Sequence, residues 1–261
     1  MAISMDSFFA IALISLITSI SGNLSVFRKG SFLVASVSHS ALAGVALSLF
    51  LSSYGIGIDY FAVAAIFAVA FSAITVVLSR FQDIDTAISI SFALSMALAV
   101  VFLSLSRNIS AKIWSFLFGE LYLITDRDII YLILTAIVVL LLFGTLYERM
   151  IFYLFDPEGA EASGMNVKIL DLALILIISI SVVSVIRSVG AILAYAIFIA
   201  PAAIGKKIAR SVKQSLLISF LITLSCLYLG LLISFSIPVS ASAISALIAS
   251  SLYLISMVKK D

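Results

Sequence analysis

His39 is the side chain in this sequence best able to bind a metal ion or move a proton, and it is the chain's single histidine. It lies in FLVASVSHSALAGVALSLFLSS, an apolar stretch over residues 32–53 that carries no formal charge. Counted from Ser31, the imidazole lies about 12 Å along a helix, a depth at which ionisable groups normally face protein or a wet pathway. The residues leave two interpretations open: a transport ligand, or a structural histidine that hydrogen-bonds a neighbouring helix.

Small residues beside His39 predict close packing of the helix that carries it. They recur at every fourth position and are Ser36, Ser40, Gly44 and Ser48. Such a ridge lets another membrane helix approach closely. The neighbouring ridge has Ala35 and Ala43 on either side of His39, which leaves room around an imidazole that faces protein.

Other reactive side chains do not support an enzyme. The lone Cys226 can form neither an intrachain disulfide nor a thiolate metal site. Ser38 and Ser40 flank His39, but adjacent positions of a helix point about 100° apart, so a nucleophile would have to come from another helix. The sequence has no G-x-x-x-x-G-K-[ST] phosphate loop, so the chain cannot hydrolyse ATP alone. We expect no catalytic residue, no resident cofactor and no nucleic-acid partner.

The elements that position His39 are predicted to be membrane helices. Hydrophobic residues make up 64% of the 261 and charged residues 11%, a balance beyond what a soluble core requires. Cutting the chain at charged or turn-rich stretches leaves nine apolar segments near the roughly 20 residues that cross a bilayer. They are 8–24, 31–52, 60–78, 86–105, 129–147, 169–186, 188–205, 215–235 and 241–258. We predict one all-α transmembrane domain over residues 1–261, with nine helices or, alternatively, eight.

Basic residues give the predicted orientation. With the N-terminus outside, 11 of the 15 Lys and Arg fall in cytoplasmic loops or at the C-terminus. We therefore predict a multi-pass protein of the cell membrane whose C-terminus is cytoplasmic. Asp85 and Asp171 lie at the boundaries of their segments, and no carboxylate lies well inside a span, which disfavours a proton-driven secondary transporter.

Two loops contain more than a connection requires. The cytoplasmic loop at 148–168 includes FDPEGAEASGMNVK, which has a capping aspartate, a proline for the first helical position, two glutamates for the positive end of the helix dipole and a glycine that can end the helix. These residues are Asp156, Pro157, Glu158, Glu161 and Gly164. They predict a short surface helix, which is either an ordinary capped turn or a peg for a cytoplasmic partner. On the outer side, IWSFLFGELYLI at 113–124 is too short to span and is either a membrane-hugging segment or a docking surface.

The stretch VASVSHSALAGVALSLFL resembles the second-helix signature of the membrane subunits of metal-ion ABC importers, the zinc, manganese and iron permeases. Four more blocks match in the same order along the chain. They are DIDTAISISFALSMALAVVFLS (83–104), LFGELYLITDRDI (117–129), FDPEGAEASGMNVKILDL (155–172) and SVGAILAYAIFIAPAAIGKKIAR (188–210). Because the five blocks cover the chain nearly end to end, the sequence is identified as a member of this importer family.

The resemblance implies a mechanism with several partners. Two copies of the chain would form a homodimeric path for a divalent metal ion, two cytoplasmic ATPase subunits would drive it, and an extracytoplasmic binding protein would deliver the ion. The peg would be the coupling helix that contacts the ATPase. Its residues are Asp156, Pro157, Glu158, Gly159, Glu161 and Gly164. Pro201 in IAPAAIG would break its helix near the inner mouth and serve as a gate. The alternative is a permease for a chelated or non-metal cargo, as in the related vitamin B12 and siderophore permeases.

The implied metal site departs from the family pattern at one position. Relatives commonly have Asp four residues before the histidine, and this chain has Ala35 there. The implied ligands are therefore His39, with Ser36 and Ser40 as hydroxyl donors, and a second imidazole from the other copy. Imidazole-rich sites suit zinc, so zinc is the predicted ion, with manganese or iron as alternatives.

Overall fold

The chain is all-helical throughout the residues that the computed structural model describes, which are 5–79, 81–106, 111–119, 121 and 124–258. In this part, nine helices are long and apolar enough to cross a membrane. They are α1 (Met5–Phe27), α2 (Phe32–Ser52), α3 (Tyr60–Leu78), α4 (Ile84–Leu105), α6 (Asp126–Phe155), α8 (Val167–Val189), α9 (Ala191–Ile208), α10 (Val212–Ser234) and α11 (Ala241–Val258). The short helices α5 (Ala111–Phe118) and α7 (Pro157–Ala162) lie between spans. The predicted all-α bundle with nine spans is confirmed for the described residues.

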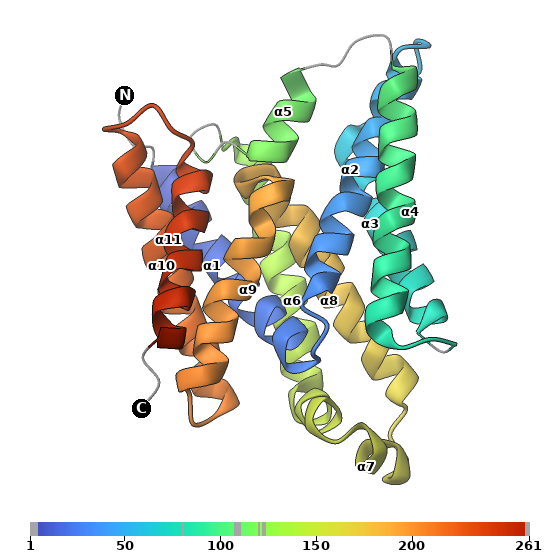
Figure 1. Cartoon of the computed structure of the whole chain (residues 1–261), viewed down its shortest axis with the longest axis vertical. Coiled ribbons are helices and arrows are strands. Elements are labelled where there is room, and N and C mark those ends of the chain that lie inside the picture. Colours follow the sequence, from blue (N-terminus) through green and yellow to red (C-terminus); the bar gives the residue numbers. More distant parts are fainter. Residues whose placement is uncertain (1–4, 80, 107–110, 120, 122–123, 259–261) are drawn as a thin grey trace.

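The long helices run roughly side by side, with α5 at one end of the bundle and α7 at the other (Figure 1). We call these the α5 end and the α7 end. Helix α1 begins at the α5 end, and α11 finishes at the α7 end. Helices α2 and α9 lie between α4 on one side and the α10–α11 pair on the other, and α2 contacts both α4 and α9 (Figure 1). The helix that carries His39 is therefore central in the bundle.

Small residues explain how closely α2 packs against α3. A Cβ atom on Gly44 would lie 2.6 Å from the carbonyl oxygen of Val63 and 2.7 Å from Cα of Ala64, so only glycine fits there. On the same ridge, the Ser48 hydroxyl donates to the carbonyl of Ile58 over 3.0 Å. The predicted small-residue ridge thus contacts α3 at Gly44 and the residues that lead into α3 at Ser48.

Helix α6 is longer than its predicted span. It has 30 residues and continues to Phe155, through the first part of the loop assigned to 148–168. At a rise of about 1.5 Å per residue it is roughly 45 Å long, which exceeds the hydrocarbon core of a bilayer. Its first turn is capped by Asp128, whose carboxylate accepts both the N–H of Thr125 at 2.8 Å and its hydroxyl at 2.6 Å.

The break in the α8–α9 region lies at Gly190. Contrary to the expected break at Pro201, α9 runs without interruption through that residue. A proline removes one helical hydrogen bond, and neighbouring helices in a membrane bundle can hold a helix together across such a loss. Gly190 has a φ of +92°, which glycine adopts without strain, and it separates the end of α8 from the start of α9.

Candidate functional site

His39 lies in α2 with its imidazole half buried. The ring of Phe92 from α4 meets it edge to face, with 4.9 Å between ring centroids and an interplanar angle of 89°. The Nδ1 atom of His39 is buried, and among the described residues it has no hydrogen-bond partner. A buried polar atom without a partner is costly, so it commonly marks a position that binds something in another state. The hydrogen bond from Nδ1 to a neighbouring helix that a structural histidine would make is not found among the described residues.

Ser36 and Ser40 are both buried and lie on the ridge that packs against α3 at Gly44. The Ser40 hydroxyl donates to the carbonyl of Ser36 over 2.8 Å, so its proton is engaged within its own helix. Its oxygen keeps lone pairs that can accept or coordinate. The structure thus places the two serines on the α3-facing ridge and the imidazole beside α4.

A complete metal cage within one chain is not found in the part of the chain that the structure describes. No group of three or more His, Cys, Asp or Glu side chains comes together there. His39 is half buried and remains partly accessible. Divalent ions in proteins usually take at least three protein ligands, and the described residues bring together no such set of these four side-chain types.

Helix α7 forms where the sequence predicts a short surface helix, and its geometry confirms the capping signals. The carboxylate of Asp156 accepts the N–H of Gly159 over 2.9 Å, and Gly164 follows the helix with a φ of +79°. Ala160 is fully buried, which fixes the helix to the bundle. Its exposed residues include Pro157, Glu158 and Glu161. The α7 end therefore presents an acidic helix away from the spans (Figure 1).

Comparison with known proteins shows which kind of membrane protein contains these elements. Residues 2–260 match the ABC 3 transport family. The chain belongs to this family. The permease is 32% identical over 237 residues to the manganese import system permease protein ScaB of Streptococcus gordonii, a match that covers 90% of this chain and 83% of that one. It is 27% identical over 249 residues to the high-affinity zinc uptake system membrane protein ZnuB of Haemophilus influenzae, covering 95% and 94%.

A solved structure has the same fold. The permease superposes on PsaBC from Streptococcus pneumoniae, determined in complex with Fab, with a TM-score of 0.84 and 27% sequence identity. The match covers 98% of this chain and 91% of that chain. The permease is therefore the multi-pass membrane subunit of an ABC transporter and not an enzyme.

At the α7 end the permease contains a cluster of charged and phenolic groups that the sequence pattern did not predict. A guanidinium nitrogen of Arg28, which follows α1, lies 2.6 Å from a carboxylate oxygen of Asp171 in α8. Tyr153 of α6 bonds both groups: Arg28 donates to its hydroxyl at 2.5 Å, and the hydroxyl donates to Asp171 at 2.5 Å. We call these three residues the arginine cluster. It fastens the α1–α2 turn to both α6 and α8.

A cavity of about 830 Å³ opens between α9 and α11 beside the α1–α2 turn. Lys206 and Lys207 line it, and both ammonium groups donate to backbone carbonyls, that of Lys206 to Val26 over 3.1 Å. Pro201 does not line this cavity. It is buried on another face of α9, where the Ser219 hydroxyl donates to its carbonyl over 3.2 Å.

The sequence predicts the helix that carries His39 and the helix α7, but no pattern in it predicts the arginine cluster. Arg28 lies in a predicted cytoplasmic loop, and Asp171 lies at the boundary of a predicted span. The predicted topology places the loop of Arg28 and the start of the span of Asp171 on the same side of the membrane, and this is the signal that could have indicated a contact between them. Opposite charges at span boundaries on one side can meet when their helices are neighbours.

Proposed function

We propose that this permease carries a divalent metal ion through the cell membrane as part of an ATP-driven importer, with His39 as a transient ligand in the path. The observation that carries the proposal is the buried Nδ1 of His39, without a partner among the described residues, in a member of the ABC 3 transport family. The named relatives import manganese or zinc. A single imidazole binds a metal ion weakly, and weak binding suits a transport path because the ion must also leave its site.

Two copies of the chain are proposed to form this path. No three His, Cys, Asp or Glu side chains come together among the described residues of one copy, so a facing copy would contribute a second His39. Helices α4 and α11 flank α2 and α9 and expose large apolar side chains that a second copy can cover (Figure 1). A separate ATPase is required because the chain has no phosphate loop, and an extracytoplasmic protein would deliver the ion.

The α7 end is proposed to face the cytoplasm, with residues 148–168 as the coupling segment and the C-terminus on the same side. The exposed acidic face of α7 supports this role, since it projects where an ATPase can reach it. Cysteine labelling in a Cys226→Ala background tests the orientation. An impermeant reagent should label Gly57→Cys from outside and Glu161→Cys from inside, and the opposite pattern would reverse the topology.

Zinc is the proposed ion, and manganese is the second candidate. Imidazole is a borderline ligand that suits zinc, and Ala35 supplies no hard carboxylate oxygen of the kind that manganese favours. Manganese is favoured by a different observation, the 32% identity to a manganese import permease. Ala35→Asp should add an oxygen donor one turn from His39, raise metal occupancy in the path and move the preference toward manganese.

Uptake by vesicles that contain the permease, its ATPase and its binding protein tests the proposal. His39→Ala should lower uptake of Zn²⁺ and Mn²⁺ by about a hundredfold or more, while binding-protein docking and basal ATP hydrolysis persist, because a lost ligand removes several kcal/mol of ion binding. His39→Asn is the matched control, since it keeps hydrogen-bonding groups and loses the imidazole. Native uptake by His39→Ala, or full rescue by His39→Asn, would make the histidine structural.

A further inference from the structure

The arginine cluster connects the helix that carries His39 to the two helices that hold α7. Arg28 lies in the α1–α2 turn, Tyr153 near the end of α6, and Asp171 near the start of α8. Helix α7 lies between α6 and α8 along the chain and contacts both, so the two partners of Arg28 lie on the two helices that flank α7. A displacement of α7 that moves either of these helices therefore acts on Arg28.

The α1–α2 turn is tight enough to pass a movement of Arg28 on to α2. The N–H of Gly30 donates to the carbonyl of Ser25 over 3.1 Å, and the Ser25 hydroxyl donates to the carbonyl of Gly30 over 3.0 Å. Helix α2 then starts at Phe32 and runs without interruption for about 10 Å to His39. A helix of this length moves as a unit, so a shift of the turn reaches the imidazole.

A second contact joins the same parts next to α7. The rings of Phe27, at the end of α1, and Phe155, at the end of α6, lie 5.5 Å apart between centroids. Phe155 directly precedes Asp156, the capping residue of α7. The α1–α2 turn thus contacts the α7 segment through a ring pair and through the arginine cluster.

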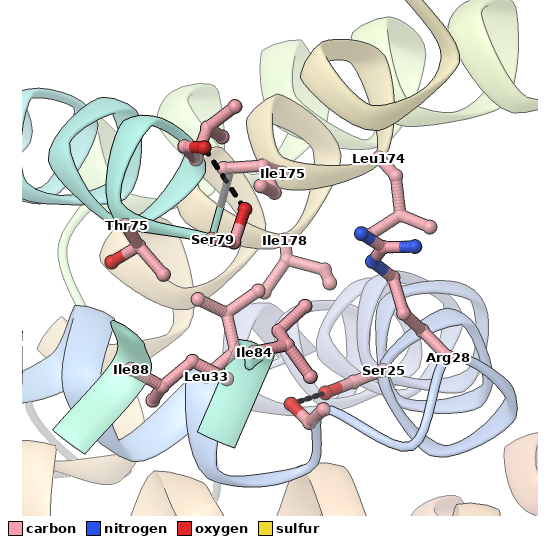
Figure 2. Close-up of a pocket in the computed structure, with 12 residues that line it drawn as sticks. Ser25, Arg28, Leu33, Thr75, Ser79, Ile84, Ile88, Leu174, Ile175 and Ile178 are labelled. Carbon is pink, nitrogen blue, oxygen red and sulfur yellow. Dashed lines mark hydrogen bonds between the residues drawn. The ribbon is translucent and has the colours of Figure 1, made fainter. Parts of the chain in front are cut away.

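A small cavity beside the cluster leaves room for movement. Figure 2 shows Arg28 at its edge, with Leu33 of α2 and Ile84 of α4 opposite Ile175 and Ile178 of α8. The cavity has about 10 Å³ of free space, roughly what one water molecule requires. Close-packed interiors resist displacement, whereas a void next to a long side chain lets that side chain shift.

We propose that Arg28, Tyr153 and Asp171 are positioning residues for transport, which transmit a movement of α7 to α2 and so set the position of His39 in the path. This inference rests on the proposed function, in which α7 contacts the ATPase and His39 meets the ion. Charge-assisted hydrogen bonds suit this role because they are strong and directional, so they transmit a displacement of α6 or α8 to the guanidinium.

The ratio of metal taken up to ATP hydrolysed tests the inference in vesicles that contain the permease, its ATPase and its binding protein. Asp171→Asn should lower this ratio for Zn²⁺ and Mn²⁺ about tenfold, a typical coupling effect, while ATP hydrolysis, co-purification with the ATPase and the KM for metal-loaded binding protein stay near native. Tyr153→Phe should lower it about threefold, because the direct Arg28–Asp171 contact remains. The charge exchange Arg28→Asp with Asp171→Arg should restore most of the lost ratio.

Asp128→Asn is the matched control, because Asp128 pairs with Arg187 at the other end of the same two helices. It should lower thermal stability and leave the uptake ratio near native. A merely structural role for the cluster predicts that both variants lower stability and that neither lowers the ratio more than the other. That result, or failure of the charge exchange to restore any of the ratio, would overturn the inference.

Hydrogen exchange gives a second readout that does not depend on the cargo. Binding of ATP by the attached ATPase should change exchange in residues 26–33 of the native permease, and this change should be clearly smaller in Asp171→Asn, where the Phe27–Phe155 contact remains. If the native complex takes up neither metal, the proposed function fails while this measurement still decides the inference. An ATP-dependent change of equal size in Asp171→Asn would show that the cluster transmits nothing.

Discussion

Helices α6 and α8 are held together by different means at their two ends. At the α5 end, Arg187 of α8, whose side chain is 27% exposed, pairs with Asp128 of α6, whose side chain is 7% exposed. At the α7 end, the paired side chains of Arg28 and Asp171 are 16% and 19% exposed and border a small cavity at Arg28. The Arg187–Asp128 pair joins α8 directly to α6, whereas the Arg28–Asp171 pair joins α8 to the α1–α2 turn.

Backbone contacts reinforce the α5 end. A Cβ atom on Gly119, which follows α5, would lie 2.2 Å from the carbonyl carbon of Val189, and one on Gly190 would lie 2.4 Å from that of Phe118. Main chain therefore lies directly against main chain there, and such a contact leaves no space into which either segment could move. The α7 end is held by long side chains beside a void. The difference indicates a bundle that is fixed at the α5 end and adjustable at the α7 end.

The largest expected effect is that of a methyl group at the rigid contact. Gly190→Ala places a Cβ inside the backbone of Phe118 at a φ of +92°, so the α5 segment must move away. We expect a loss of about 3 kcal/mol or more of stability, measured as a large fall in melting temperature in detergent. Gly57→Ala is the control, because no atom lies within 4 Å of its Cβ. Equal melting temperatures for the two variants would contradict the rigid contact.

A smaller loss of stability is expected when the Arg187–Asp128 ion pair at the α5 end is broken. Asp128→Asn leaves Arg187 without its carboxylate and weakens the cap on Thr125, which should cost about 2 kcal/mol of stability. Thermal unfolding with and without 1 M salt, a concentration that screens exposed charges but affects buried pairs much less, measures the effect. A native melting temperature would show that the pair contributes nothing to the rigidity of the α5 end.

The ion pair at the α7 end should matter less for stability. Asp171→Asn should cost about 1 kcal/mol, because the side chain of Asp171 is 19% exposed whereas that of Asp128 is 7% exposed, and the asparagine can still bond Tyr153. The same unfolding measurement ranks it against Asp128→Asn. The comparison between the two ends fails if Asp171→Asn proves to be the more destabilising variant.

The smallest expected effect on the stability of the whole bundle comes from a substitution that acts only within α7. Asp156→Ala removes the cap on Gly159 and should cost about 1 kcal/mol, confined to this short helix. Hydrogen exchange should become faster in residues 157–162, while the melting temperature of the bundle hardly changes. Glu161→Ala is the control, since this exposed glutamate is not the capping residue. Unchanged exchange would mean that Ala160 alone holds α7 in place.

Local patterns in the sequence were sufficient for the elements and for part of the site. Apolar segments of spanning length predicted the nine helices, because a bilayer leaves helices as the only way for an open chain to satisfy its backbone. Asp156 and Gly164 predicted the ends of α7 because capping depends on residues a few positions apart. The helix break predicted at Pro201 is absent, since tertiary packing keeps α9 continuous through a residue that would break an isolated helix.

Composition and neighbours along one helix were enough to predict the class of the protein, the spans, the helix that carries His39 and the position of α7. The tertiary structure alone decided that His39 meets Phe92, that Arg28 pairs with Asp171 and that Gly119 lies against the α8–α9 junction. Each of these contacts joins residues far apart in the chain, and helix packing brings them together. A pattern along one helix contains no record of which other helix lies beside it, so these contacts required the fold.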